Sequence, residues 1–111
     1  MPIQIGNVCV DTNDLKRASE FWQAVTGYKI SSSDDSTVYF EDPAQKAAGL
    51  SLQLVPEKRQ GKNRLHLDLF TSDLDDEVKR VKGLGATEVA SYDGWVVLKD
   101  LDDNEFCICA A

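Results

Sequence analysis

Short stretches in which apolar and polar residues alternate recur along the chain, and this period of two indicates β-strands with one buried face. Two longer stretches instead place apolar residues three or four positions apart, which indicates amphipathic helices. The first helix is predicted from Asp14 to Thr26, with Gly27 as its stop signal. The second is predicted from Asp73 to Leu84, with Gly85 as its stop signal. Asp14 or Asn13 can supply the N-cap oxygen of the first helix, and each glycine can adopt the left-handed conformation that ends a helix.

The same order of elements occurs twice. Each predicted helix follows one strand, Val8 to Asp11 or Leu65 to Phe70, and precedes three further strands. The sequence therefore predicts an α+β fold of two βαβββ modules, residues 1–58 and 62–111, within a single domain of residues 1–111. We expect the modules to form a curved mixed sheet with helices on its outer face, because pseudo-symmetric halves commonly line a shared groove.

Alternation also sorts the strand residues into two faces. One face is almost wholly aliphatic or aromatic and is predicted to pack under the helices; it comprises Val8, Val10, Val38, Phe40, Leu52, Leu54, Leu65, Leu67, Leu69, Val96, Leu98, Phe106 and Ile108. The other face is polar but rich in aromatic, thiol and imidazole groups; it comprises Asn7, Cys9, Asp11, Tyr39, Glu41, Ser51, Gln53, Arg64, His66, Asp68, Trp95, Lys99, Glu105, Cys107 and Cys109. We predict that this second face lines a concave ligand-binding groove.

Charge and cysteine content narrow the range of partners. The 111-residue chain has a formal net charge of −7, which argues against nucleic acid or an anionic membrane as a partner. It has neither an apolar run long enough to span a membrane nor the regions of a signal peptide. Three cysteines without disulfide spacing suit a reducing compartment, so we predict a cytoplasmic protein. The basic residues of the segment from Pro56 to Arg64 are interpreted as a solvated linker between the modules, with an anion-attracting rim as the alternative.

Several segments give the chain a resemblance to a known superfamily. They are Asp14 to Trp22 with Gly27-Tyr28, Lys62 to Leu69, Leu84 to Thr87, and Asp100 to Cys107. In their order and spacing they resemble the vicinal oxygen chelate superfamily, which includes glyoxalases, bleomycin-resistance proteins and extradiol dioxygenases, and they are most similar to its small glyoxalase-like members. The resemblance covers essentially the full length of the chain.

Enzymes of this superfamily hold a divalent metal with four residues, and the resemblance maps these positions onto Asn7, Gln53, His66 and Cys107. In the repeat, Asn7 is then equivalent to His66, and Gln53 is equivalent to Cys107. Only His66 keeps a residue type usual in the family, and neutral amides are weak donors for a hard cation. We therefore expect no cofactor and no metal. The alternative is a divalent ion held by His66, Glu105, Gln53 and Cys107, or by a displaced set of His66, Asp68 and Glu105.

Two functions remain open. In the first, the groove binds a small organic molecule without metal, as the resemblance to bleomycin-resistance-like proteins implies. Tyr39 and Trp95, taken as equivalent in the two modules, would then stack on a planar, neutral or cationic ligand. In the second, the chain is a lyase or isomerase of glyoxalase type, in which His66 is the general base and Glu105 its catalytic partner.

The predicted ligand-binding residues are Asn7, Tyr39, Gln53, Arg64, His66, Asp68, Trp95 and Cys107. Neither nucleic acid nor a membrane is expected as a partner. A homodimer is predicted, because short half-sheets leave strand edges that a second chain can cover.

Overall fold

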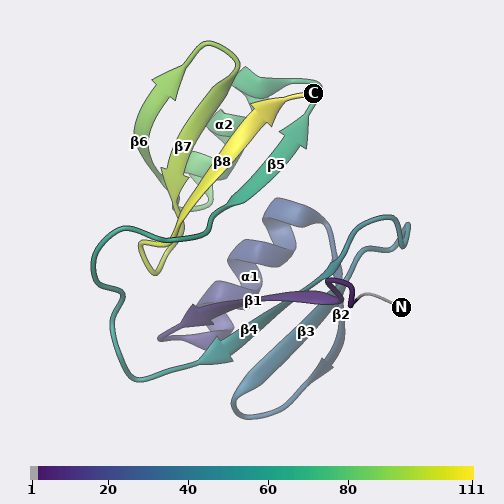
Figure 1. The fold of residues 1–111 in the computed structure, drawn as a ribbon. Helices are drawn as coiled ribbons and strands as arrows, with labels where there is room; N and C mark the ends of the chain where they lie inside the picture. The colour runs from purple at the N-terminus through teal and green to yellow at the C-terminus, as the bar shows by residue number, and fades with distance from the viewer. Residues whose placement is uncertain (1–2) are drawn as a thin grey trace. The chain divides into compact units, whose positions relative to one another are not determined.

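The computed structural model describes residues 3–111, so the first two residues of the predicted domain lie outside it. Two compact units meet in the chain between Lys58 and Arg59. Each unit is a βαβββ module with its own four-stranded mixed sheet (Figure 1). The α+β fold of two βαβββ modules is thus confirmed, and the joining of the two sheets into one curved surface stays a prediction.

The first module packs one helix on its sheet. Its elements are β1 (Asn7–Thr12), α1 (Leu15–Thr26), β2 (Lys29–Ser33), β3 (Thr37–Glu41) and β4 (Gly49–Leu54). The strands lie in the order β1-β4-β3-β2, in which β1 is parallel to β4 and the other neighbours are antiparallel. Helix α1 contacts β4 and β3, so it covers one face of this sheet.

The second module repeats this arrangement. Its elements are β5 (Leu67–Thr71), α2 (Leu74–Gly83), β6 (Thr87–Tyr92), β7 (Trp95–Lys99) and β8 (Glu105–Ala110). The strands lie in the order β5-β8-β7-β6, again with one parallel pair, β5 and β8. Helix α2 contacts β8. Among the described residues, neither helix is long and apolar enough to cross a membrane.

Both helices begin where the sequence predicts, and each has an aspartate as its N-cap. The Asp14 carboxylate accepts a hydrogen bond from the backbone N–H of Arg17 at 3.1 Å, and Asp73 caps α2 in the same way. Helix α1 ends at Gly27, whose φ of 72° is left-handed. After α2, Gly85 adopts a φ of 118°, and a Cβ there would lie 2.7 Å from the Leu101 side chain. Both positive φ angles favour glycine at the predicted stops, and a Cβ at Gly85 would also displace the end of the Leu101 side chain.

Each sheet buries the apolar face that alternation predicts. The buried apolar residues are Ala18, Phe21, Trp22, Val38, Phe40, Leu50 and Leu52 in the first module, and Val78, Val81, Ala86, Val96, Leu98, Phe106 and Ile108 in the second. The other predicted core residues are covered less well: Val8, Val10, Leu67 and Leu69, on the outer strands β1 and β5, are half-buried. Leu54 is 42% exposed and Leu65 is 88% exposed. Leu54 is the last residue of β4, and Leu65 precedes the first residue of β5, so the sheets do not cover them.

The strand registers correct the predicted equivalence of Gln53 with Cys107. Phe40 pairs with Leu50 in the first sheet, as Leu98 pairs with Phe106 in the second, so Leu50 corresponds to Phe106. One residue further on, Ser51 corresponds to Cys107, and Gln53 corresponds to Cys109. The prediction was wrong by two residues because a slip of two keeps every side chain on the same face, and alternation cannot detect it.

The predicted equivalence of Tyr39 with Trp95 is wrong for the same reason. Tyr39 pairs with Ser51 across β3 and β4, and Val97 pairs with Cys107 across β7 and β8. Tyr39 therefore corresponds to Val97. The two aromatic rings share the predicted face of their respective sheets, but they do not occupy the same place in the repeat.

The chain leaves the first module along a fixed path. The side-chain amide of Asn13, at the start of α1, donates hydrogen bonds to the carbonyl oxygens of Val55 and Glu57, both at 2.9 Å. These residues directly follow β4, so the first part of the linker is held against the first module. Residues 55–57 are thus anchored by a side chain at the same end of the parallel pair β1 and β4, where Thr12 pairs with Leu54.

Candidate functional site

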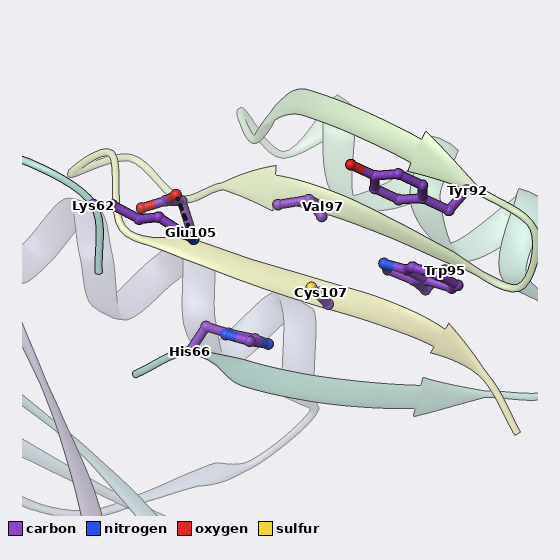
Figure 2. A pocket seen from close by; sticks show the side chains of 7 residues that line it. All are labelled: Lys62, His66, Tyr92, Trp95, Val97, Glu105 and Cys107. Atoms are coloured by element: carbon purple, nitrogen blue, oxygen red, sulfur yellow. Dashed lines mark hydrogen bonds and ion pairs between the residues drawn. The ribbon is translucent and has the colours of Figure 1, made fainter. Parts of the chain in front are cut away.

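A pocket of about 400 Å³ lies on the polar face of the second sheet (Figure 2). It is lined by Lys62, His66, Tyr92, Trp95, Val97, Glu105 and Cys107, all from the second module. Figure 2 shows His66 and Cys107 between the Lys62–Glu105 pair at one end and the aromatic rings at the other. Of the predicted ligand-binding residues, the structure brings His66, Trp95 and Cys107 together here.

Two stacked rings form the aromatic end of the pocket. The ring centroids of Tyr92 and Trp95 are 4.8 Å apart, and the ring planes differ by 18°. The rings flank the two-residue turn Asp93-Gly94, in which Gly94 has a φ of 96°, so they are cross-strand partners on β6 and β7. Tyr92 is a lining residue that the sequence analysis missed. The Asp-Gly pair between two alternating runs is a hairpin signal that would have revealed it.

Three side chains of different chemical type lie close together on the polar face of the second sheet. Asp68 and Cys107 are direct partners across β5 and β8, and His66 lies on the same face two residues before Asp68. His66 Nε2 lies 3.1 Å from Asp68 Oδ1. The ligating atoms of the three residues all lie within 4.8 Å of one another. We call this group the His66 cluster.

The three side chains of the His66 cluster differ in their exposure to solvent. The side chains of His66 and Asp68 are about half exposed, whereas Cys107 is buried, with 7% of its surface exposed. Burial raises the pKa of the Cys107 thiol, and the nearby negative charge of Asp68 raises it further. A thiol with a raised pKa is protonated at neutral pH, so without a cation beside it Cys107 is a poor nucleophile.

Glu105, predicted as a catalytic partner, is held by residues of the linker. Arg59 and Lys62 form ion pairs with its carboxylate, and the backbone N–H of Asn63 donates to Oε1 at 3.0 Å. The Asn63 side-chain amide also donates to the Glu105 carbonyl oxygen at 3.1 Å. We call these four residues the Glu105 clasp. The sequence predicts a solvated linker. In the structure, the Glu105 carboxylate on β8 instead binds this linker to the second module.

The clasp determines the protonation state of Glu105. Hydrogen bonding from the Asn63 N–H lowers the pKa of the carboxyl, and the charges of Lys62 and Arg59 lower it further. The side chain is only 11% exposed. A carboxylate that is already ionised and surrounded by donors is poorly suited to act as a general acid or base. The catalytic role of Glu105 stays a prediction that these contacts disfavour.

The other predicted ligand-binding residues lie elsewhere. Asn7, Tyr39 and Gln53 share the polar face of the first sheet. There Asn7 Nδ2 donates to Ser51 Oγ at 2.8 Å, and Gln53 Oε1 accepts from the Cys9 thiol at 3.8 Å. Arg64 is exposed before β5 and does not line the pocket. A contribution of these residues to ligand binding stays a prediction.

Solved structures of several proteins resemble the chain. FosX of Listeria monocytogenes, a fosfomycin resistance protein crystallised with Mn(II) and sulfate, has a TM-score of 0.83 and 16% identity over 100% of this chain and 92% of its own. A glyoxalase/bleomycin resistance protein/dioxygenase family enzyme of Burkholderia phytofirmans PsJN has a TM-score of 0.81 and 19% identity over 97% and 98% of the two chains. A glyoxalase-related enzyme of Fulvimarina pelagi has a TM-score of 0.79 and 12% identity over 97% and 88%. At these identities the likeness shows the fold alone.

The residues at the superfamily's four metal positions do not suit an ion such as the Mn(II) of FosX. Hard divalent ions prefer carboxylate oxygens, and the set mapped from the sequence offers two amides, an imidazole and a buried thiol. The strand register puts Ser51 in place of Gln53, which replaces one amide with a hydroxyl and again supplies no carboxylate. The Asn7 amide is already bonded to Ser51, and the Glu105 carboxylate of the alternative set is bound by the clasp. We therefore derive no chemical step through a metal of this kind.

Sequence comparison extends the likeness beyond the fold. No protein curated for its function matches the chain in sequence. The family model of the glyoxalase-like domain, however, matches residues 7–109. This match begins with the first residue of β1 and ends within β8, so it includes both modules and the pocket. The chain therefore belongs to the glyoxalase-like domain family, as its resemblance to the vicinal oxygen chelate superfamily implies.

Proposed function

We propose that the protein binds a small, planar organic molecule in the pocket of its second module, and that this binding needs no hard divalent metal. The observation that carries the proposal is a pocket of about 400 Å³ that combines a stacked aromatic pair with a polar floor. Ligand pockets of roughly 300–1,000 Å³ with apolar walls and a few polar groups are typical of small-molecule sites.

The aromatic pair supplies the stacking surface. Tyr92 is 52% exposed and Trp95 is 41% exposed, although both rings are large and apolar enough to be buried. A planar ligand laid against the exposed face of this pair would remove apolar surface from water and gain an offset stacking contact. His66 and Cys107 on the pocket floor offer hydrogen-bonding groups that can orient such a ligand (Figure 2).

The charges around the pocket favour a ligand without strong negative charge. Arg59 and Lys62 offset the carboxylate of Glu105, and His66 lies beside Asp68. A phosphate-rich ligand would meet both carboxylates with little free positive charge to compensate. Antibiotic resistance is named for related structures, so we propose an antibiotic or toxic metabolite as the ligand and sequestration as the role. The phosphonic acid found with Mn(II) in FosX is not of the ligand class proposed for this pocket.

Tryptophan fluorescence tests this proposal. Trp22 is 2% exposed in the core, so quenching by an added ligand reports on Trp95. In a screen of aromatic metabolites and antibiotics, we expect saturable quenching of the wild type and none of Trp95→Phe. By calorimetry, Trp95→Ala should weaken binding about fivefold or more, which corresponds to ~1 kcal/mol.

The matched control is Val89→Ala, which removes a half-exposed apolar side chain from β6 outside the pocket lining and should leave binding unchanged. Binding that is insensitive to Trp95→Ala would contradict the proposal. A clear preference for nucleotides or sugar phosphates would contradict its ligand class.

A glyoxalase-type isomerase or lyase is the second candidate, and the 3.1 Å contact between His66 Nε2 and Asp68 Oδ1 favours it. Asp68 would orient the imidazole while His66 moves a proton on the carbon next to a substrate carbonyl. The test is turnover of the hemithioacetal of methylglyoxal and glutathione. His66→Gln should lower kcat by about 100-fold, whereas Glu105→Gln should leave it nearly unchanged. Saturable ligand binding without turnover would contradict the enzyme function and support only the binding function.

A further inference from the structure

One residue from each strand contributes to a single row across the polar face of the second sheet. Tyr92 on β6 pairs with Trp95 on β7. Cys109 on β8 pairs with Trp95 on one side and with Phe70 on β5 on the other. Paired residues point to the same face of a sheet, so the row consists of two rings, a thiol and a third ring. We call these four residues the aromatic row. Phe70, at its end, is 73% exposed although its side chain is wholly apolar.

The small side chain of Cys109 leaves one position of the aromatic row without a ring. Neighbouring strands lie about 4.8 Å apart. The ring centroids of Tyr92 and Trp95 are separated by the same 4.8 Å. Tyr92 covers the face of the indole that is turned to β6, so the other face is turned to β8 (Figure 2). A ligand ring over Cys109 would lie about one strand spacing from Trp95 and from Phe70, within the range of about 4.5–7 Å that aromatic pairs prefer.

We propose that the space over Cys109 is a slot for the ring of a planar organic cation, with Trp95 and Phe70 as its two walls. This inference rests on the proposed function, since it uses the Trp95 surface, and it adds a second wall, a floor and a charge. Phe70 and Cys109 lie outside the lining of the pocket described above, so the slot extends the site from the aromatic end of the pocket. Two walls cover both faces of a ring, which removes about twice as much apolar surface from water as a single stacking contact.

The charges near the slot favour a cation. Asp68 lies two residues before Phe70 on the same face of β5, with its side chain half exposed, and Asp93 directly follows Tyr92 in the turn. Burial raises the pKa of the Cys109 thiol, and the negative charge of Asp68 raises it further, so this charge acts at the floor of the slot. The faces of aromatic rings also attract cations. Neither the aromatic row nor the next row of the sheet includes a lysine or arginine; that next row is Asp68, Cys107, Val97 and Ala90.

Calorimetry with three probes of the same bicyclic shape tests the charge of the ligand. They are N-methylquinolinium, which is a cation, quinoline, which is uncharged at neutral pH, and quinaldate, which is an anion. We expect N-methylquinolinium to bind tightest and quinaldate weakest. Asp68→Asn should weaken N-methylquinolinium binding about threefold or more and leave quinoline binding unchanged. The matched control is Asp75→Asn, which removes the same charge from an exposed position on α2 and should change neither.

Two further variants test the slot itself. Phe70→Leu keeps an apolar side chain but removes the ring, so it should weaken N-methylquinolinium binding about threefold or more. Cys109→Phe places a ring in the slot and should abolish binding of all three probes. Cys109→Ser adds no bulk and should bind like the wild type. Circular dichroism verifies that each variant is folded.

The outcomes distinguish this inference from the proposed function. Binding that is retained in Phe70→Leu and Cys109→Phe but weakened in Trp95→Ala would overturn the slot and leave the single stacking surface. Binding that is insensitive to Trp95→Ala would contradict both. Failure of N-methylquinolinium to bind the wild type at millimolar concentration would overturn the slot, whereas the proposed function is tested by its own ligand screen. If quinaldate bound as tightly as N-methylquinolinium, the cationic ligand class would be wrong.

Discussion

Leu52 and Gln53 are neighbours on β4 whose side chains point to opposite faces of the first sheet. Leu52 is completely buried, whereas Gln53 is exposed. Truncation of Leu52 removes packed methyl groups and leaves a cavity, so Leu52→Ala should lower the free energy of unfolding by about 2–5 kcal/mol. Gln53→Ala should cost far less. Urea denaturation of both variants measures this contrast, and equal costs would mean that the assignment of faces is wrong.

At the same scale, the residues of the site divide into those that alternation could find and those that it could not. His66, Asp68, Trp95 and Cys107 were predicted because a period of two assigns them to the polar face whatever the register. Val97 lies on that face too, but its side chain is apolar and carries no functional group, so no sequence pattern singles it out. Asp68 was predicted as a ligand-binding residue, but its pairing with Cys107 depends on strand register, which alternation does not specify.

At the scale of elements, the Glu105 clasp makes stability depend on pH. The folded-state pKa of Glu105 is lowered from an ordinary value of 4.5. The ionised carboxylate therefore contributes stability above pH 4.5, and this contribution is lost as pH falls towards and through the lowered folded-state pKa. Urea midpoints between about pH 3 and 7 should show this loss, and Glu105→Gln should be less stable than the wild type at neutral pH with a shallower decline in acid.

Glu20→Gln is the control for the clasp. Glu20 pairs with Lys16 one helical turn away, and their side chains are 70% and 89% exposed. Exposed pairs contribute little to stability, so this variant should follow the wild type at every pH. If Glu105→Gln also followed the wild type, the clasp would not hold the linker in solution.

The elements themselves could be predicted wherever their signals are local. Both N-cap aspartates and the glycine that ends α1 act within one helical turn, and both helices begin where the sequence predicts. The clasp could not be predicted in this way. It joins Arg59 to Glu105 across most of the second module, and no periodicity relates a linker residue to a strand residue so distant in sequence.

At the scale of the whole molecule, the strand edges lead to a prediction about assembly. Each four-stranded sheet has two outer strands, β1 and β2 in one module and β5 and β6 in the other. An outer strand can pair with a further strand, and a second copy of the chain can supply one. Sedimentation equilibrium should therefore give about twice the chain mass of 12.3 kDa. A mass that stays at 12.3 kDa at high concentration would contradict the predicted homodimer.

The linker contacts described above also determine how many residues between the two modules have an unanchored backbone. Asn13 holds the carbonyl oxygens of Val55 and Glu57, and Glu105 holds Arg59 by an ion pair. The Glu105 carboxylate also accepts a hydrogen bond from the backbone N–H of Asn63, so the backbone is held up to Glu57 on one side and from Asn63 on the other. What looks in the sequence like a long flexible connection is thus reduced to residues 58–62, within which Arg59 and Lys62 are bound only through their side chains. Any movement of one module against the other must turn on this short segment or release an anchor.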